Sequence, residues 1–511
     1  MSATRDNTNG NRRSRRAHLI DAALMDSLGL DALIPPELSD WQTLFVEAMA
    51  YFLDRLPAAR LSAIIAGQLA FEPQADPAQR LVALLAQCPM LHKLGQVMAR
   101  NHALDAGLRS RLQTLESMPS SLPAAAISAA LGGAFAEDAG VALSDRPLAE
   151  GSVAVVLPFS WRAGGHVREG VFKVLKPGIE ARLAEELAIL PGLASMLERR
   201  GRQLGLPALD YRGNLSSVAQ LLDNEVRLDR EQHNMRCASA LLGDHNVVFV
   251  PPLLPWCTPR ITAMARVRGS SVVDAALPAA RKSIVADALI TKLLAKPFWS
   301  REDEALFHGD LHAGNLLLDE DGRIAVIDWS LAARLAKSQR EALLAVAIGG
   351  LSFDAQRIRE ALAALGLREE ANPRVQSCID DALDALADGR QQLGFDWLVG
   401  MLDALALQGS SGFGAELAVF RKSWVSLAGV IRDLRGSVRA DFPLLAEGLQ
   451  HFLAEWPARL VAAPDSRDFS THVSNAELMT LAWSGWSGAG RYWTRLLEHA
   501  VTRAKSAERP C

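Results

Sequence analysis

One stretch of this sequence decides the fold: His308-Gly309-Asp310-Leu311-His312-Ala313-Gly314-Asn315, which is followed by Ile327-Asp328-Trp329-Ser330. It places Asp310, Asn315 and Asp328 in the order that phosphoryl transfer requires. One carboxylate stands beside the attacking hydroxyl, and a carboxamide and a second carboxylate hold Mg²⁺ on the phosphates. Since an acidic surface hairpin rarely has this order by chance, the stretch predicts an ATP-dependent phosphotransferase or ATPase with a kinase-like loop.

The residues between Asn315 and Asp328 predict a β-hairpin. Apolar runs at 316–318 and 324–327 flank the turn residues 319–322, a pattern typical of two antiparallel strands. Such a hairpin brings Asn315 and Asp328 to the same end of paired strands, so that both can reach one metal ion. Mg²⁺ prefers oxygen ligands, so neither neighbouring histidine needs to bind it.

The two histidines of the loop carry separate expectations. His308 precedes Asp310 by two residues, and it either orients the loop through hydrogen bonds or is an ordinary buried histidine. His312 is expected to be structural.

Composition indicates a globular protein with more than one domain. The chain has 511 residues, of which 49% are hydrophobic, and a formal net charge of -4, which argues against a general nucleic-acid binder. Its five cysteines form no Cys-x-x-Cys pair, so neither a disulfide framework nor a zinc site is expected. We recognise no secretory signal and no apolar run that spans a membrane. A cytoplasmic protein is therefore expected, with peripheral association with a membrane as the alternative.

The pattern along the chain predicts an α+β, protein-kinase-like bilobal fold, with a small mixed N-lobe and a mostly helical C-lobe. The expected divisions are a disordered basic tail (1–18), a helical N-terminal extension (19–140), the N-lobe (141–266), the C-lobe (267–450) and a helical C-terminal extension (451–511). Residues 266–271 are expected to connect the lobes.

Within this layout, the periodicity of apolar residues predicts the main elements. Strands are expected at 152–158, 170–175, 247–250 and 260–265, and helices at 177–199 and 215–242. After Asp328 the chain is expected to be mostly helical to its end. Its last helix, at about 491–505, is expected to pack on the protein's own core, or alternatively to lie on a membrane surface.

Lys173 is the candidate nucleotide lysine. It lies within the apolar run 171–175, where a charged side chain is costly unless its ammonium reaches a partner. In a kinase-like N-lobe such a lysine contacts the nucleotide phosphates and pairs with a helix glutamate. An edge-strand lysine that faces water is the alternative. The acidic partner is expected from the helix at 215–242, where chemistry alone leaves Glu225, Asp229 and Glu231 open.

Over roughly residues 85–340 the chain resembles the UbiB/AarF family of atypical kinase-like proteins, which act in coenzyme Q biosynthesis. Lys93-Leu94-Gly95-Gln96 is similar to the family's K-x-G-Q motif on a helical N-terminal extension, and residues 147–152 lie where the family has an Ala-rich nucleotide loop. Residues 172–179 are similar to its V-K-V-x-x-P-G segment. Residues 229–234 are similar to its E-x-x-N helix, which favours Glu231 as the partner of Lys173.

The resemblance implies an extension that partly covers the nucleotide cleft. Lys93 and Gln96 would point to where a protein substrate would otherwise sit, so ATPase or small-molecule kinase activity is expected. The implied site residues fall into four sets. These are the catalytic residues Asp310 and Lys173; the ATP contacts Lys173, Glu231, Ala149, Gly151, Ser152 and Met264; the motif residues Lys93, Gly95 and Gln96; and the Mg²⁺ ligands Asn315 and Asp328.

The sequence also departs from the family pattern. Glu150 in the nucleotide loop would repel phosphates unless it faces away or helps to hold a metal. The usual D-F-G is Asp328-Trp329-Ser330, the usual H-P-G-N is residues 312–315, and the acidic element after K-x-G-Q is blurred at 115–119. The family's frequent C-terminal transmembrane segments are not recognised. A diverged member is therefore expected, serving coenzyme Q, isoprenoid-lipid or a related biosynthesis.

Two other functions stay open. One is a nucleotide-binding pseudokinase scaffold for a lipid or a biosynthetic partner. The other is a dedicated small-molecule or peptide hydroxyl phosphotransferase, which would lack the motif at 93–96 and whose helix at 85–120 would pack far from the cleft. The acceptor, whether a small molecule, a lipid, a peptide or water, and the oligomeric state are left undetermined.

Overall fold

The computed structural model describes residues 39–72, 74–99, 106–116, 123–131, 140–207, 209–244, 246–367, 372–407, 413–435 and 441–482. Contacts divide the chain into unit 1 (Met1–Gln232 and Pro252–Arg266) and unit 2 (His233–Pro251 and Val267–Cys511). The fold is of the predicted α+β class. The predicted basic tail and the predicted helix at 491–505 lie outside the described residues.

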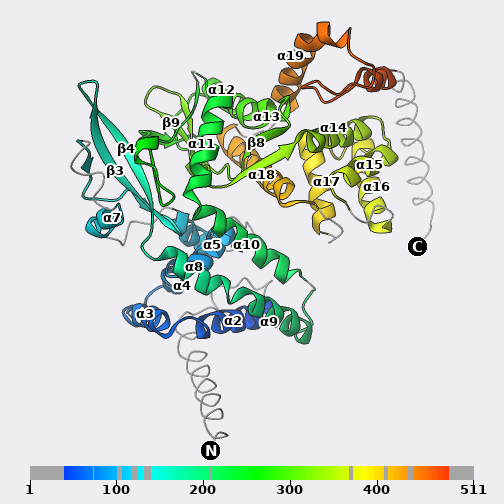
Figure 1. Ribbon diagram of the computed structural model, residues 1–511. Coiled ribbons are helices and arrows are strands. Elements are labelled where there is room, and N and C mark those ends of the chain that lie inside the picture. The colour runs from blue at the N-terminus through cyan, green and yellow to red at the C-terminus, as the bar shows by residue number, and fades with distance from the viewer. Residues whose placement is uncertain are drawn as a thin grey trace, which may run out of the picture. The chain divides into compact units, whose positions relative to one another are not determined.

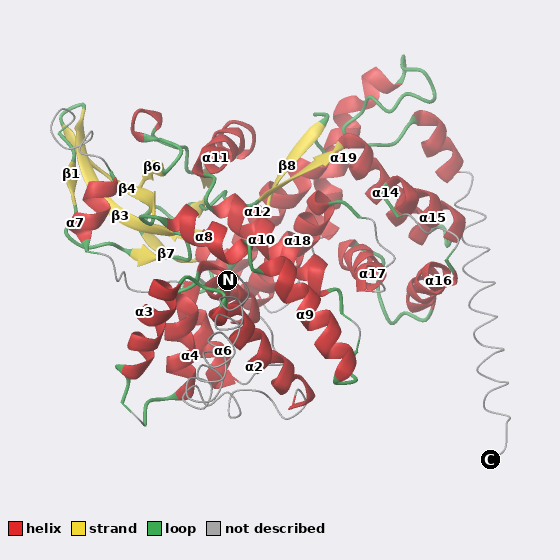
Figure 2. Ribbon diagram, turned by 60° about the horizontal axis from the view of Figure 1, so that its bottom comes forward, coloured by secondary structure: helices red, strands yellow, loops and turns green. Residues whose placement is uncertain are grey.

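Unit 1 contains an antiparallel sheet in the order β1-β3-β4-β6, with β2 paired to β3 (Figure 2). Its strands are β1 (Ala142–Leu143), β2 (Ala149–Glu150), β3 (Ala154–Ala163), β4 (His166–Leu175) and β6 (Ile261–Ala265). The long β3–β4 hairpin (Figure 1) turns at Gly164 and Gly165, whose φ angles are 57° and 80°, a region that glycine adopts readily. In this register Lys173 lies opposite Val156 on one side and Thr262 on the other.

Most helices of unit 1 share one hydrophobic core with the ends of these strands, whereas Ile127 packs in a second core against the sheet. The helices are α2 (Ser39–Asp54), α3 (Ala58–Leu69), α4 (Pro77–Ala86), α5 (Pro89–Ala99), α6 (Ala106–Gln113), α7 (Ala124–Ala130), α8 (Ile179–Leu187), α9 (Leu190–Gln203) and α10 (Tyr211–Glu225), with the 3₁₀ turn η3 (Thr114–Glu116) after α6. Leu53, Leu84, Leu175 and Leu222 are among the buried side chains of the first core. The N-terminal helices therefore pack on the sheet-bearing part of unit 1 and do not form a separate core.

Two helices that the sequence predicted as continuous are each broken, so those predictions are wrong in detail. The helix predicted at 177–199 ends at Leu187 and restarts as α9, because Pro191 in the first turn of α9 cannot continue a preceding helix. The helix predicted at 215–242 is α10 followed by α11 (Leu228–Leu242). Arg227 N donates to Asn224 O in the turn between them, where no proline or glycine signals a break.

Unit 2 contains two sheets. The larger has the order β5-β10-β9-β7, and the smaller pairs β11 with β8. Their bounds are β5 (Val247–Phe249), β7 (Gly269–Ser271), β8 (Glu304–His308), β9 (Leu316–Asp319), β10 (Ile324–Val326) and β11 (Ala332–Ala336). The β9–β10 pair is the predicted hairpin, with Leu316 opposite Val326.

Two strands, β7 and β11, lie where the sequence predicted other structure. Strand β7 lies in the segment predicted as a connector, and β11 lies in the segment predicted to be helical. Each is a strand because of its partner: β7 pairs with β9, and all five residues of β11 pair with β8. Pairing with a distant strand outweighs local propensity in short segments of this kind.

The rest of unit 2 is helical. The helices are α12 (Ala279–Ile290), the π-helical turn Thr291–Ala295, α13 (Lys296–Phe298), α14 (Lys337–Leu351), α15 (Ala355–Ala364), α16 (Pro373–Ala387), α17 (Phe395–Leu407), α18 (Ala415–Arg435) and α19 (Asp441–Arg459). Within the part of the chain that the structure describes, no helix has both the length and the apolar character needed to cross a membrane.

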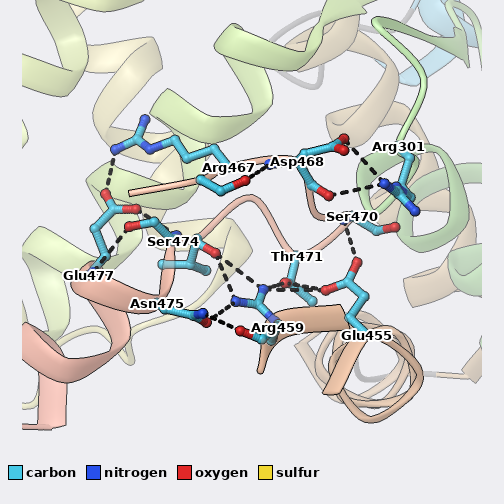
Figure 3. Close-up of polar contacts among 12 residues, drawn as sticks. Arg301, Glu455, Arg459, Arg467, Asp468, Ser470, Thr471, Ser474, Asn475 and Glu477 are labelled. Carbon is cyan, nitrogen blue, oxygen red and sulfur yellow. Dashed lines mark hydrogen bonds and ion pairs between the residues drawn. The ribbon is translucent and has the colours of Figure 1, made fainter. Parts of the chain in front are cut away.

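A buried arginine fixes the segment that follows α19 (Figure 3). Arg459 is 4% exposed, and its guanidinium contacts the side chains of Glu455, Thr471 and Asn475. Glu455 also accepts hydrogen bonds from Ser470 N and Thr471 Oγ1. The cation is thus compensated by a carboxylate that has further donors of its own, which is the condition for burying an ion pair without a large penalty.

His472 lies beside this cluster and stays neutral. Its Nε2 donates to Phe298 O at 2.6 Å. The pKa of His472 is lowered to about 4, chiefly by burial. The nearby cations of Arg340 and Lys337 contribute to this lowering, whereas the Phe298 hydrogen bond and Glu455 oppose it. Protonation of this imidazole would therefore weaken the contact between the segment after α19 and α13.

Candidate active site

His308 fixes the loop at 308–315 from the end of β8. Its Nδ1 accepts a hydrogen bond from Asp310 N at 3.1 Å, and its Nε2 donates to Ile327 O at 3.1 Å. The ring is 1% exposed, and burial lowers the pKa of His308, so the imidazole is neutral with its proton on Nε2. Of the two roles considered for His308, the structure favours orientation of the loop. His308 thus contacts the backbone of Asp310 and that of Ile327, the residue before Asp328.

Asn315 closes the loop on its other side. Its Nδ2 donates to Asp310 O at 3.0 Å, so the side-chain oxygen is the atom that would serve as a ligand. Ile327 N donates to Asn315 O at 3.0 Å, which extends the β9–β10 pairing by one step. Asn315 and Asp328 therefore flank the same end of the hairpin, as the sequence pattern predicted. Both offer the oxygen ligands that Mg²⁺ prefers.

Asp328 has a left-handed backbone conformation with φ of 59°, which aspartate tolerates better than most residues but which still costs free energy. Its Oδ1 accepts a hydrogen bond from Ser330 N at 3.2 Å. The neighbouring Trp329 is 1% exposed and packs edge-to-face on His308 with ring centroids 4.6 Å apart. Asn234 Nδ2 donates to Trp329 O at 3.1 Å. Burial of Trp329 thus anchors the turn at the position where the family pattern has phenylalanine.

Asp310 itself contacts a residue that sequence reasoning missed. Lys422 Nζ donates to Asp310 Oδ1 at 3.1 Å, across 112 residues of sequence. His312 Nε2 lies 3.9 Å from Asp310 Oδ2, and His312 Nδ1 accepts from Gly314 N. Lys422 belongs to α18, and no local motif marks it, so only the tertiary structure reveals the contact.

In unit 1, Lys173 Nζ lies 2.7 Å from Glu231 Oε1, with side chains 14% and 0% exposed. Of the three acids that chemistry left open, Glu231 is therefore the one that meets Lys173. Glu225 instead pairs with Lys93, and Asp229 pairs with Arg227 in an exposed ion pair. A buried ammonium held by a buried carboxylate is the arrangement in which a kinase-like lysine contacts nucleotide phosphates.

The K-x-G-Q residues tie α5 to the nucleotide loop and to η3. Glu225 accepts from Lys93 and, at 2.6 Å, from Ser152 Oγ, so one carboxylate joins the motif to the loop. A Cβ at Gly95 would lie 2.6 Å from a methyl of Leu115, which explains why this position needs glycine.

Gln96 contacts the backbone of η3. Its Nε2 donates to Leu115 O at 2.9 Å, so its amide holds η3 against α5. Because α5 reaches the partner of Ser152, this helix packs near the nucleotide loop. That placement does not favour the dedicated small-molecule or peptide hydroxyl phosphotransferase, whose helix at 85–120 is expected to pack far from the cleft.

Glu150, in the nucleotide loop, pairs with a lysine that follows β4. Its Oε1 lies 2.7 Å from Lys176 Nζ, with side chains 12% and 10% exposed. Burial lowers the pKa of Lys176, and the pairing with Glu150 opposes that shift. The charge of Glu150 is therefore compensated, and the repulsion of phosphates considered for it is reduced.

The remaining nucleotide-loop candidates lie close to one another along the sheet. Gly151 N donates to Ala154 O at 2.9 Å, and Ala149 on β2 lies opposite Val156. Met264, on β6, lies opposite Val171 of β4 and is 8% exposed.

The chain is similar in sequence to several known proteins. Residues 113–362 match the family model of the ABC1 atypical kinase-like domain. An uncharacterized protein of Mycobacterium tuberculosis is 34% identical over 198 residues, which are 37% of this chain and 38% of that protein. A probable protein kinase UbiB of Azotobacter vinelandii is 27% identical over 222 residues, which are 41% of this chain and 39% of that protein.

The matched segments thus span about two fifths of the length of these relatives. A solved Rv3197–erythromycin complex from Mycobacterium tuberculosis aligns with 74% of this chain and 92% of its own, at 19% identity and a TM-score of 0.45. Residues 113–362 thus match an ABC1 atypical kinase-like domain, and several proteins described as probable protein kinase UbiB are among the relatives.

Proposed function

We propose that the protein is an Mg²⁺-dependent ATPase or phosphotransferase of the UbiB type, with water or a small-molecule, lipid-related or peptide hydroxyl as the acceptor. The observation that carries the proposal is the loop in which His308 and Asn315 both bond to the backbone of Asp310. These bonds hold the carboxylate-bearing residue at the start of the hairpin that ends at Asp328. These contacts support the proposal because phosphoryl transfer needs a carboxylate that is held in a fixed position near the metal ligands.

The residues divide the proposed chemistry between them. Asp310 would accept the proton of the attacking hydroxyl, and Lys173, held by Glu231, would contact the α- and β-phosphates. Asn315 and Asp328 would hold Mg²⁺, which when bound supplies positive charge to the phosphates. The acceptor oxygen would form a bond to the γ-phosphorus while the bond to the β,γ-bridging oxygen breaks, and ADP would leave with that electron pair.

The acceptor class is the finer part of the proposal. With water the products are ADP and phosphate, and with a hydroxyl they are ADP and a phosphate ester. The resemblance to the UbiB/AarF family, which acts in coenzyme Q biosynthesis, supports an acceptor from coenzyme Q or isoprenoid-lipid biosynthesis.

The test is ATP turnover by purified protein with Mg²⁺, alone and with isoprenoid alcohols, lipid extracts or hydroxyl-bearing peptides. Lys173→Ala and Asp310→Asn are each expected to lose roughly a hundredfold or more in rate, because charge stabilisation and base catalysis contribute on that scale. Wild-type turnover by Asp310→Asn would refute the assignment. Nucleotide binding without loss of the γ-phosphate under any condition would instead support a pseudokinase scaffold.

A further inference from the structure

Helix α18 supports the catalytic loop at two adjacent positions. Ser423 Oγ donates a hydrogen bond to His308 O, and Lys422 Nζ donates to Asp310 Oδ1 at 3.1 Å. The first contact fixes the backbone that enters the loop, and the second reaches the carboxylate that would act on the acceptor. Lys422 lies outside the segment 113–362 that matches the family domain, so that match does not assign it a role.

The turn of α18 that carries Lys422 is held in place by its neighbours. Arg421 Nε donates to Asp403 Oδ1 at 2.9 Å, and Trp424 Nε1 donates to Asp396 Oδ1 at 2.9 Å. Both partners belong to α17 and are distinct from the loop. Because these contacts fix the helix, the backbone of Lys422 has a defined position relative to Asp310.

A stabilising surface pair is the plainest alternative for this contact. The Lys422 side chain is 37% exposed and that of Asp310 is 16% exposed, and ion pairs at such exposure contribute only about 0–1 kcal/mol to stability. The pair therefore adds little to folding, but it restricts the orientation of the Asp310 carboxylate. Oδ1 is directed to Lys422 and Oδ2 toward His312. A general base depends on such orientation more than on proximity alone.

We propose that Lys422 is a positioning residue of the active site, whose ammonium holds the Asp310 carboxylate in the orientation that receives the acceptor's proton. This inference rests on the phosphotransfer function proposed above. Lys422 acts through Asp310, so its contribution to the rate depends on the presence of that carboxylate.

The test is a double-mutant cycle on the full-length protein, with ATP turnover as the readout. Lys422→Met is expected to lower kcat roughly tenfold to a hundredfold, because a misplaced reacting group loses rate on that scale. KM for ATP should change less than about threefold, since Lys422 is not assigned to nucleotide binding. Lys422→Arg should recover most of the rate. In an Asp310→Asn background, Lys422→Met should have no further effect.

Arg421→Met is the matched control, since Arg421 lies on the same turn and pairs with Asp403. It should leave kcat unchanged even if the melting temperature falls, because the Trp424 bond to Asp396 still holds this turn of α18. The positioning role would be overturned if Lys422→Met left kcat unchanged. It would also be overturned if Lys422→Met lowered kcat by the same factor in the wild-type and the Asp310→Asn backgrounds. Wild-type protein that turns over no ATP would refute the proposed function itself, so the two failures are distinguishable.

Discussion

Separating Lys173 from Glu231 should destabilise unit 1 far more than separating an exposed ion pair nearby. The two atoms lie 2.7 Å apart and the side chains are 14% and 0% exposed. At this distance the attraction is about 6 kcal/mol for an effective dielectric constant near 20. Removal of one partner leaves the other charge buried, so Lys173→Met and Glu231→Leu should each cost about 3–5 kcal/mol.

The double variant distinguishes this explanation from simple loss of packing. Because neither charge remains, Lys173→Met combined with Glu231→Leu should recover most of the lost stability, which gives a coupling energy of several kcal/mol. The control cycle uses Arg227 and Asp229, which are 44% and 48% exposed at 3.4 Å. Their coupling should stay below about 1 kcal/mol.

The assay is native-state hydrogen exchange of peptides from β3 and β4, because exchange reports the opening of this sheet separately from unit 2. A coupling energy for Lys173 and Glu231 no larger than that of the control pair would refute the reasoning. The stable double variant should still lack ATP turnover. Restored turnover would show that the pair has only a structural role.

Three further predictions concern unit 2. The pKa of His472 lies at about 4, below its ordinary 6.5. The stability that the neutral imidazole contributes is therefore complete above pH 6.5 and is lost as the pH falls toward 4. That loss is about 3 kcal/mol, and His472→Gln should remove this part of the pH dependence of the urea midpoint. Gly309→Ala would place a Cβ 2.6 Å from Leu331 Cγ and 2.8 Å from both Leu331 O and Val419 Cγ1, so it should cost about 1–3 kcal/mol and slow ATP turnover, and Val419→Ala, which leaves the backbone oxygen in place, should restore neither. Arg459→Met would leave Glu455 buried without its cation and cost about 3–5 kcal/mol, seen as faster proteolysis at 460–474; an unchanged cleavage rate would count against the buried cluster.

The sequence predicted those parts of the site that depend on local pattern. The β9–β10 hairpin was predictable because apolar runs flank a turn, and the spacing of Asp310, Asn315 and Asp328 follows from that hairpin. The resemblance favoured Glu231 over Glu225 because of its place in the E-x-x-N segment, and the structure places Glu231 beside Lys173. Chemistry alone could not make this choice, since all three acids lie in one stretch of sequence.

Other features depend on partners that are distant in sequence. Strand β11 exists because β8 pairs with it, and residues 332–336 alone have no clear strand pattern. Lys422 reaches Asp310 across 112 residues, and Glu225 joins Lys93 to Ser152 across 132 and 73 residues. Contacts of this kind are set by packing of the whole unit, which single-sequence periodicity does not describe.

The most direct test of the central claim is ³¹P NMR of ATP and Mg²⁺ incubated with wild-type protein and with Asp328→Asn. Asparagine keeps the preference for a left-handed backbone at this position, so the variant should fold normally while losing one charged metal ligand. The account predicts loss of the γ-phosphate signal with wild-type protein and a rate lower by roughly a hundredfold or more with Asp328→Asn. Equal rates in the two proteins, or no loss of γ-phosphate with wild-type protein and any acceptor, would contradict it.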